Sequence, residues 1–513
     1  ALIADEFGGG KAHLTTRQNL QYHFVPLANV PALLHKLADV CLTSREACYN
    51  TVRNVTTDPL AGLLPDEPFD VRPYARQLAF AFLHKSLTDS MPRKFKIAFS
   101  GGKEDNIATQ INDVGLRAVV RHEDGVEKRG FRMSIGGGLG PLPNEAKLLD
   151  EFVPVERLVS RIEGVLRVFN QYGNRKNKNM ARLKFVVRER GFDWVVDQVN
   201  QAYADILANG GIATPELVPE GFGGFQSVPQ APGAGAALPV LDAAPQWDPE
   251  FDEWLESNVQ EQKQPGYAIV TVKVPEGNLT GEQLRGVAKL AEDAGDGVVR
   301  VTMNQNLVLG FVALANLKRV YAALRIVGLA GSGAHELEDI ITCPGAYSCN
   351  LGLTKSMNLG AALSGVVREY RDPEVRKLSI KISGCPNSCG QHWIGDFGFY
   401  GNARKIDGKE VPYYQFLLGG GYDENGMMRF GLAIQSIPAR SAPIVVRRVI
   451  DHYLSNHLEG ETFRDYVVRN KVETFRAMTA DVAKPSGPSP ELCLDWGDDM
   501  AFSLKLGRGE CAG

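Results

Sequence analysis

The sequence has few cysteines and one very long stretch with none. It has eight cysteines in 513 residues, and none lies between Cys48 and Cys343. This number is too small for a disulfide scaffold, so paired cysteines are better explained as metal ligands or redox groups. We therefore expect a reducing compartment, the cytoplasm or an organelle stroma.

Other features are missing as well. No apolar run reaches the roughly 18 residues that a membrane span requires, and the first residues show no signal-peptide pattern. The net charge of −4 gives no electrostatic reason to expect a nucleic-acid or membrane partner. No flavin or nicotinamide fingerprint is found. These absences indicate a globular protein without a nucleic-acid or membrane partner, one that receives its electrons from outside if it is a redox enzyme.

Half of the cysteines lie in two short segments. Cys343 and Cys349 are in "TCPGAYSC" (342–349), and Cys385 and Cys389 are in "GCPNSC" (384–389). Two thiol pairs from distant segments are typical of iron–sulfur clusters. Zinc is the main alternative, although zinc ribbons favour two to four residues between the cysteines of each arm. Buried cysteines without a ligand are the third interpretation.

The chain contains two copies of one unit. "RKFKIAFSGG" (93–102) matches "RKLSIKISGC" (376–385), 283 residues later. "HLTTRQNLQYHFV" (13–25) matches "RVTMNQNLVLGFV" (300–312), 287 residues later. In the first copy Gly102 and Asn106 stand where the second copy has Cys385 and Cys389. Thiols that are present in one copy only indicate a site rather than packing.

Each copy is expected to hold a small βα unit and a larger unit in a mixed α/β (α+β) fold. Alternating patterns predict strands over 267–274 and 377–383, and an amphipathic pattern predicts a helix over 280–295. The Pro-, Gly- and Ala-rich segment between the copies is expected to be a linker. The expected divisions are 1–40 and 41–214 in the first copy, a linker at 215–250, 251–327 and 328–480 in the second copy, and a tail at 481–513.

Basic residues are concentrated in the copy that lacks the thiols. In "MPRKFKIAFS" (91–100), alternation places Lys94 and Lys96 on the strand face opposite Phe95, Ile97 and Phe99. The second copy has Ser379 in place of Lys96. A solvated strand face is the simpler interpretation of this pair. Arg17, Gln21 and His23 are alternate residues and would share one strand face, although each could also be an ordinary surface residue.

The combined motifs resemble those of the siroheme-containing sulfite and nitrite reductases. "CPGAYSC" with "GCPNSCG" is similar to the cluster motif of that family, and "TTRQNLQYH", "VRNV" and "PRKFK" are similar to three further signatures. The resemblance covers nearly the whole chain. It implies ferredoxin-like half-domains followed by larger cofactor domains, with two cofactors, siroheme and a [4Fe–4S] cluster.

The resemblance also implies roles for individual residues. The cluster would be bound by Cys343, Cys349, Cys385 and Cys389, and Cys389 would bridge it to the siroheme iron. Asn387 would support the cluster environment through hydrogen bonds. Lys94, Lys96 and Arg53 would bind the anionic substrate, and the siroheme carboxylates would lie near a further set, Arg17, Gln21, His23 and Arg93.

The implied reaction is the six-electron reduction of sulfite to sulfide. The alternative within the family is the reduction of nitrite to ammonia, but nitrite enzymes tend to have Asn where this chain has Lys96. The expected donor is ferredoxin or another one-electron donor protein, including a separate flavoprotein, and a monomer is compatible with the sequence. Two other classes are a corrin-pathway monooxygenase-like relative and an electron carrier that uses the cluster alone.

The last expectations concern the start of the chain and its remaining residues. Residues 1–10 match 288–297, so we expect the chain to begin inside a helix and to lack the counterpart of 266–287. That counterpart would include a further pocket arginine where the second copy has Lys273, and its absence would leave an unpaired edge and an exposed apolar face. His392 and Trp393 are expected to be packing residues. The remaining cysteines, Cys41, Cys48, Cys493 and Cys511, are expected to be free thiols.

Overall fold

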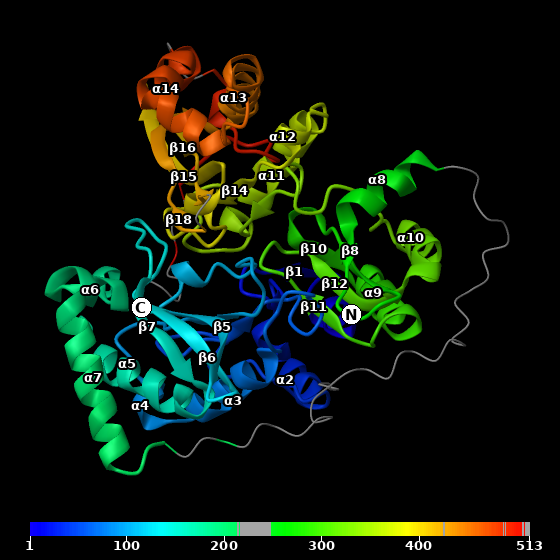
Figure 1. Ribbon diagram of the computed structural model, residues 1–513. Helices are drawn as coiled ribbons and strands as arrows, with labels where there is room; N and C mark the ends of the chain where they lie inside the picture. Colours follow the sequence, from blue (N-terminus) through cyan, green and yellow to red (C-terminus); the bar gives the residue numbers. More distant parts are fainter. Residues whose placement is uncertain are drawn as a thin grey trace.

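The computed structural model describes residues 1–212, 215, 248–423, 426–485, 487, 489–504 and 507. Figure 1 shows two larger α/β domains, one in blue and cyan and one in yellow and orange, with the smaller green unit beside them. Most of the predicted linker 215–250 lies outside the described residues, as does Cys511. The first two residues of helix α8 (Pro249–Asn258) fall inside the predicted linker.

The two larger domains contain sheets of the same topology. Each sheet has five strands, in the orders β3-β4-β5-β6-β7 and β13-β14-β15-β16-β19. In each, the first two pairings are parallel and the last two are antiparallel. The first sheet consists of Thr56–Thr57, Ile97–Ser100, Val114–Glu123, Val126–Ile135 and Lys147–Pro154. The second consists of Ile341–Thr342, Ile380–Ser383, Phe397–Ile406, Lys409–Leu418 and Leu432–Pro438. This repeated topology is what a duplicated chain predicts.

Helices cover the sheets and complete two separate cores. The first core includes Phe95, Ile97 and Phe99, all fully buried, so the predicted apolar face of this segment is confirmed. Strand β4 itself begins only at Ile97. The first domain has helices α3 (Arg72–Phe82), α4 (Ser86–Asp89), α5 (Leu158–Tyr172), α6 (Leu183–Arg190) and α7 (Phe192–Ala208). The second has α11 (Ser356–Val367), α12 (Pro373–Arg376), α13 (Ala442–Asn456), α14 (Phe463–Met478) and α15 (Ala480–Ala483).

The second half-domain is a four-stranded sheet with helices. Its strand order is β11-β12-β9-β8, with bounds Val299–Val301, Leu307–Ala313, Tyr267–Val272 and Val259–Glu261. Helix α9 (Gly281–Ala294) confirms the predicted helix, and it begins with a capping box between Thr280 and Gln283. Helix α10 (Leu317–Ile326) packs against α9. The predicted strand at 267–274 ends at Val272.

The first half-domain is smaller and shares a sheet with the second copy. It consists of α1 (Leu2–Phe7), β1 (Lys11–Leu14), β2 (Leu20–Gln21) and α2 (Val30–Ala38). Strand β1 pairs with β2 on one side and with β10 (Asn278–Thr280) on the other, so β1 is the central strand and β2 and β10 are the two edges of this sheet. No side chain of α2 is buried, and Leu20, Phe24 and Leu27 are exposed. Figure 1 shows β1 lying beside β10.

No helix among the described residues is both long enough and apolar enough to cross a membrane. The described part of the tail packs on the second copy, where Cys493 is buried against Val411 and Tyr413.

Candidate active site

A cavity of about 450 Å³ lies between the two copies of the unit. One wall is basic and comes from the first copy. The other carries the four paired cysteines and comes from the second copy. The basic wall includes Arg17, Arg53, Lys94, Lys96 and Arg182, and the thiol wall includes Cys343, Cys349, Cys385 and Cys389. Duplication and folding therefore bring together the two groups of residues that the sequence singles out.

Arg17 is fixed at the base of the basic wall by polar contacts. Its Nη1 donates to Asn112 Oδ1 at 2.7 Å, and its Nη2 donates to the Asn54 carbonyl at 2.8 Å. Asn54 returns a bond from Nδ2 to the Arg17 carbonyl at 2.7 Å. Burial lowers the pKa of Arg17 to about 10, which still leaves the guanidinium charged at neutral pH.

The prediction that Arg17, Gln21 and His23 share one strand face is wrong. Arg17 lies in a turn between β1 and β2, and only Gln21 belongs to a strand. Thr15 Oγ1 accepts bonds from the backbone N–H groups of Arg17 and Asn19, and Gln18 has a left-handed backbone with φ of 59°. These contacts favour a turn over a strand. All three predicted residues nevertheless line the cavity.

Arg53 and the two lysines form the rest of the predicted basic wall. Arg53 donates to the carbonyl oxygens of Tyr49 at 3.0 Å and Ala47 at 2.5 Å, which orients its side chain. Lys94 and Lys96 both line the cavity. Burial lowers the pKa of Lys96 well below its ordinary value, and the charges of Arg17, Arg182 and Lys94 add to this effect. Lys96 is therefore an ammonium group that loses its proton readily.

Arg182 is a cavity residue that the sequence analysis missed. It precedes α6 and pairs with the buried carboxylate of Asp113, at 3.1 Å from Nε and 2.8 Å from Nη2. Asp113 also accepts the backbone N–H of Lys96 at 2.8 Å. One carboxylate thus holds two parts of the basic wall. Arg182 lies in no motif, and its partner is 69 residues away in sequence, so no local signal could have identified it.

The thiol wall is anchored by backbone contacts. Gly384 N–H donates to the sulfur of Cys343 at 3.2 Å, and the Asn387 backbone N–H also bonds the sulfur of Cys385. Burial raises the pKa of Cys343 and raises that of Cys385 to about 12, where the neighbouring cysteines add to the effect. These thiols would become thiolates only with a compensating cation, and bound iron supplies that charge.

The polar groups around the cysteines fit an iron–sulfur cluster. The hydroxyls of Thr342, Ser348 and Ser388 are buried in the cavity lining and have no hydrogen-bond partner among the described residues. Cluster and thiolate sulfurs are acceptors that such donors would satisfy. No three His, Cys, Asp or Glu side chains in the described part of the chain lie together closely enough to hold a single metal ion.

In the first copy, the positions that correspond to Cys343 and Cys389 hold polar residues that bond to each other. Asn106 matches Cys389, and "TTDPL" (56–60) matches "ITCPG" (341–345), which sets Asp58 against Cys343. Asn106 Nδ2 donates to Asp58 Oδ2 at 3.2 Å, and Asp58 is 1 % exposed. A hydrogen-bonded pair therefore occupies the positions at which the second copy has thiols.

The other predicted residues are placed differently. Asn387 lines the cavity, and the Nε2 of His23 is buried there without a described partner. Arg93 is not among the residues that line the cavity; its guanidinium donates to Asn50 Oδ1 at 3.5 Å. Cys48 is exposed, while its neighbour Ala47 lines the cavity.

His392 and Trp393 have packing contacts, and each also has a polar feature. The ring of His392 lies 4.7 Å from that of Tyr400, and both of its nitrogens are buried without a described partner. Burial lowers the pKa of His392 to about 3. Trp393 Nε1 donates to the Gly140 carbonyl at 2.9 Å, a contact that joins the two copies.

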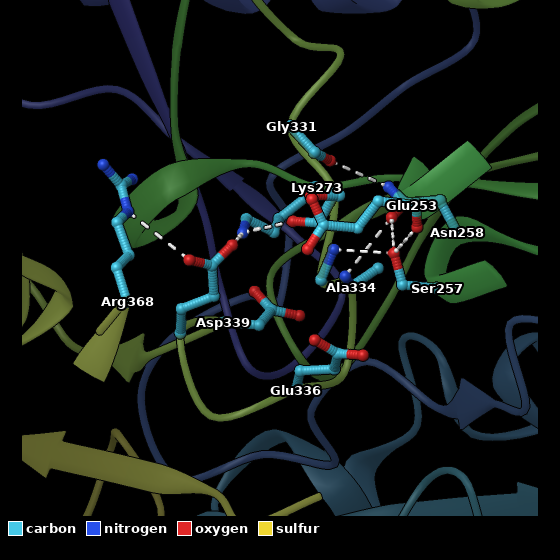
Figure 2. Close-up of polar contacts among 12 residues, drawn as sticks. Glu253, Ser257, Asn258, Lys273, Gly331, Ala334, Glu336, Asp339 and Arg368 are labelled. Carbon is cyan, nitrogen blue, oxygen red and sulfur yellow. Dashed lines mark hydrogen bonds and ion pairs between the residues drawn. The ribbon is translucent and has the colours of Figure 1, made fainter. Parts of the chain in front are cut away.

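Lys273 lines a different cavity, of about 400 Å³, between the second half-domain and the segment that precedes residues 342–349, the cluster arm that carries Cys343 and Cys349. Figure 2 shows Lys273, Ser257 and Asn258 facing this segment, from Gly331 to Asp339. Lys273 pairs with Glu338 and donates to the Ser332 carbonyl at 2.5 Å. Because its ammonium is engaged in these contacts, Lys273 serves here to join two elements.

Two family models match the chain. "Nitrite and sulphite reductase 4Fe-4S domain" matches residues 48–206 and 333–484. "Nitrite/Sulfite reductase ferredoxin-like half domain" matches residues 1–40 and 260–326. Each model thus matches twice, once in each copy, and this confirms the predicted duplication of a half-domain and a larger domain.

Curated relatives and a solved structure agree with these models. A ferredoxin--nitrite reductase from Synechococcus elongatus is 31% identical and covers 85% of this chain and 79% of its own. A sulfite reductase [ferredoxin] from Mycobacterium tuberculosis is 28% identical and covers 92% and 79%. The solved structure of Mycobacterium tuberculosis NirA protein has a TM-score of 0.75 at 27% identity and covers 93% and 81%.

These matches, together with the thiol wall, establish siroheme and a [4Fe–4S] cluster as the cofactors. The chain belongs to the nitrite and sulphite reductase family.

Proposed function

We propose that this chain reduces sulfite to sulfide with six electrons and that Lys96 directs this preference. The observation that carries the proposal is the basic wall, in which Lys94, Lys96, Arg17 and Arg53 line one cavity with the thiols. Sulfite carries more negative charge than nitrite. A second lysine, in place of the Asn that is usual in nitrite enzymes, therefore favours sulfite.

The residues of the basic wall bind the anion and supply protons. Arginine guanidinium groups match the flat spread of oxygens in a small oxyanion. Breaking sulfur–oxygen bonds requires protons, so that each oxygen leaves as water. Lys96 suits proton donation because burial lowers its pKa. When bound, siroheme and the cluster would supply an iron that binds the anion and the electrons for its reduction.

We assign the cofactor contacts as part of the same proposal. Cys343, Cys349, Cys385 and Cys389 would hold the cluster, and Cys389 would hold siroheme as well. Arg17, Gln21 and His23 would bind the siroheme carboxylates; Arg93, assigned to the same group by the resemblance, does not line the cavity. The buried Nε2 of His23, which has no described partner, supports this assignment because a carboxylate would satisfy it. Asn387 supports the cluster environment.

Ferredoxin is the proposed electron donor. The two relatives described above are named for ferredoxin, one as a nitrite reductase and one as a sulfite reductase. A cytoplasmic location fits this proposal, since the thiols must stay reduced until the cluster is assembled.

The test compares sulfite and nitrite as substrates of the holoenzyme with a reduced donor. We expect the wild type to have the higher kcat/KM with sulfite. Lys96→Asn should lower kcat/KM for sulfite more than for nitrite, whereas Lys103→Asn, at an exposed lysine of the same copy, should change neither. A wild type that prefers nitrite would contradict the proposal, and an equal loss with both substrates would rule out a selectivity role for Lys96.

A further inference from the structure

Two glutamines occupy the same place in the two copies and share an unusual backbone. Gln18 and Gln305 each begin the sequence "QNL", 287 residues apart. Their φ angles are 59° and 64°, a left-handed conformation that residues other than glycine seldom adopt. Such a conformation persists only where the surroundings enforce it, and it often marks a functional constraint. The contacts of both side chains show what that constraint is.

Gln305 joins three segments around the cluster arm. Its Oε1 accepts the backbone N–H of Thr342 at 2.8 Å, directly before Cys343. Its Nε2 donates to the Leu14 carbonyl at 2.7 Å and lies 3.2 Å from His13 Nε2. Gln305 is 1 % exposed, so every one of these bonds forms away from bulk water. The first thiol ligand is thus tied to strand β1 of the other copy.

Gln18 makes the equivalent contact in the first copy. Its Nε2 donates to the Thr57 carbonyl at 2.8 Å, and its Oε1 accepts the Thr57 N–H at 3.3 Å. Thr57 precedes Asp58, as Thr342 precedes Cys343. The neighbouring Arg17 and Asn54 exchange bonds at 2.8 and 2.7 Å, so Gln18 fixes the turn that carries Arg17 against the segment that follows Arg53.

We propose that these glutamines are a matched pair of positioning residues with separate tasks. Gln305 fixes the position of Cys343, and through it the binding of the cluster. Gln18 fixes the spacing between Arg17 and Arg53, and through it the binding of the anion. The same position of the duplicated unit therefore supports the thiol wall in one copy and the basic wall in the other. This inference rests on the family and its cofactors and does not depend on whether sulfite or nitrite is the substrate.

The test uses two matched variants of the holoenzyme, Gln305→Leu and Gln18→Leu, which remove the amide and keep most of the volume. Supporting partners of this kind commonly contribute roughly tenfold to metal affinity or activity. We expect Gln305→Leu to release iron to a chelator roughly tenfold faster and to shift the midpoint potential of the cluster, with KM for sulfite and nitrite little changed. Gln18→Leu should raise both KM values and leave the potential of the cluster in place.

Two results with the leucine variants would overturn the proposal. One is a Gln305→Leu protein whose iron release and cluster potential equal those of the wild type. The other is the same loss of both readouts in both variants, which would indicate a general structural role. Gln305→Glu retains the acceptor for Thr342 N–H and serves if the leucine variant does not fold. It should show the same effect on iron release, smaller in size, and an unchanged rate would equally overturn the proposal. Because iron release and potential need no substrate, a wrong assignment of sulfite would not affect this result.

Discussion

At the scale of single residues, the site depends on charges that are held out of water. Lys96 is surrounded by Arg17, Arg182 and Lys94, and burial together with these cations lowers its pKa. An anion between these groups would offset their repulsion, so an empty cavity is electrostatically unfavourable and a filled one is not. This explains why a group of positively charged side chains can be maintained at the interface of two domains.

The lowered pKa of Lys96 predicts a pH effect. The ammonium loses its proton at a lower pH than ordinary lysine does, so attraction for the anion weakens as pH rises through that pKa. We expect kcat/KM for sulfite to decline on the alkaline side and this decline to move to higher pH in Lys96→Arg, because arginine stays charged. The ionisation of sulfite is common to both proteins and cancels in the comparison. Identical pH profiles would show that another group causes the decline.

A second residue-scale prediction concerns the Ser388 hydroxyl. It is buried beside Cys389 and has no described partner, so a sulfur of the bound cluster is a suitable acceptor. A hydrogen bond to cluster sulfur stabilises the reduced, more negative state and raises the midpoint potential. Ser388→Ala should therefore lower that potential in a titration followed by electron paramagnetic resonance. Ser160→Ala is the control, since Ser160 is buried in α5 and its hydroxyl accepts the Ile212 N–H. An unchanged potential in Ser388→Ala would exclude this contact.

Local spacing was enough to identify the thiols but not every cation. Cys343 with Cys349, and Cys385 with Cys389, lie within short motifs, and these motifs identify them without a structure. Arg182 reaches the cavity through a carboxylate on a distant strand, and no pattern in the sequence marks that contact.

At the scale of elements, patterns of apolar residues predicted what packing decides. Helix α9 follows from periodicity alone, and so does the buried face formed by Phe95, Ile97 and Phe99. The predicted strand through Arg17 is wrong because Thr15 and Gln18 fix a turn by side-chain hydrogen bonds. Alternation of residue types does not reveal such local competition.

Also at this scale, ion pairs join the second half-domain to the segment before the cluster arm. They predict that the two partners of the Lys273–Glu338 pair contribute unequally to the free energy of unfolding. Glu338 pairs with Lys273 and lies 3.4 Å from Arg368, while Lys273 is nearly buried. Lys273→Met leaves Glu338 with Arg368. Glu338→Ala leaves the buried Lys273 ammonium without its ion-pair partner, and its remaining hydrogen bond among the described residues is to the Ser332 carbonyl. Removing one partner of a buried pair costs roughly 3 kcal/mol or more, so Glu338→Ala should reduce the free energy of unfolding in urea more than Lys273→Met does. The opposite order would mean that packing of the lysine stem dominates.

At the scale of the whole molecule, the site exists only because two copies of one unit face each other with different residues. The duplication could be read from the sequence, and the resemblance to the family implied that the basic and thiol walls meet. The contacts that join the walls could not be predicted, because they connect residues far apart in the chain. Thr16 Oγ1 donates to the Cys389 carbonyl at 2.8 Å, and Trp393 reaches Gly140. Each copy therefore depends on the other for the shape of the cavity.

This dependence predicts that losing the cluster weakens both copies. Cys385→Ser removes one thiolate, and metal binding of this kind contributes directly to folding free energy. We expect the variant to lose most of its iron, to lose activity with sulfite and nitrite, and to be cut faster by protease in the arms around 343–349 and 385–389. The turn around Thr16 should become more accessible as well, because Thr16 bonds to the Cys389 carbonyl.

Cys41→Ser is the matched control at an exposed cysteine of the first copy, and this variant should keep its iron. Zinc in place of iron in the wild type would contradict the assigned cluster, and faster cleavage confined to the second copy would show that the basic wall holds its shape alone.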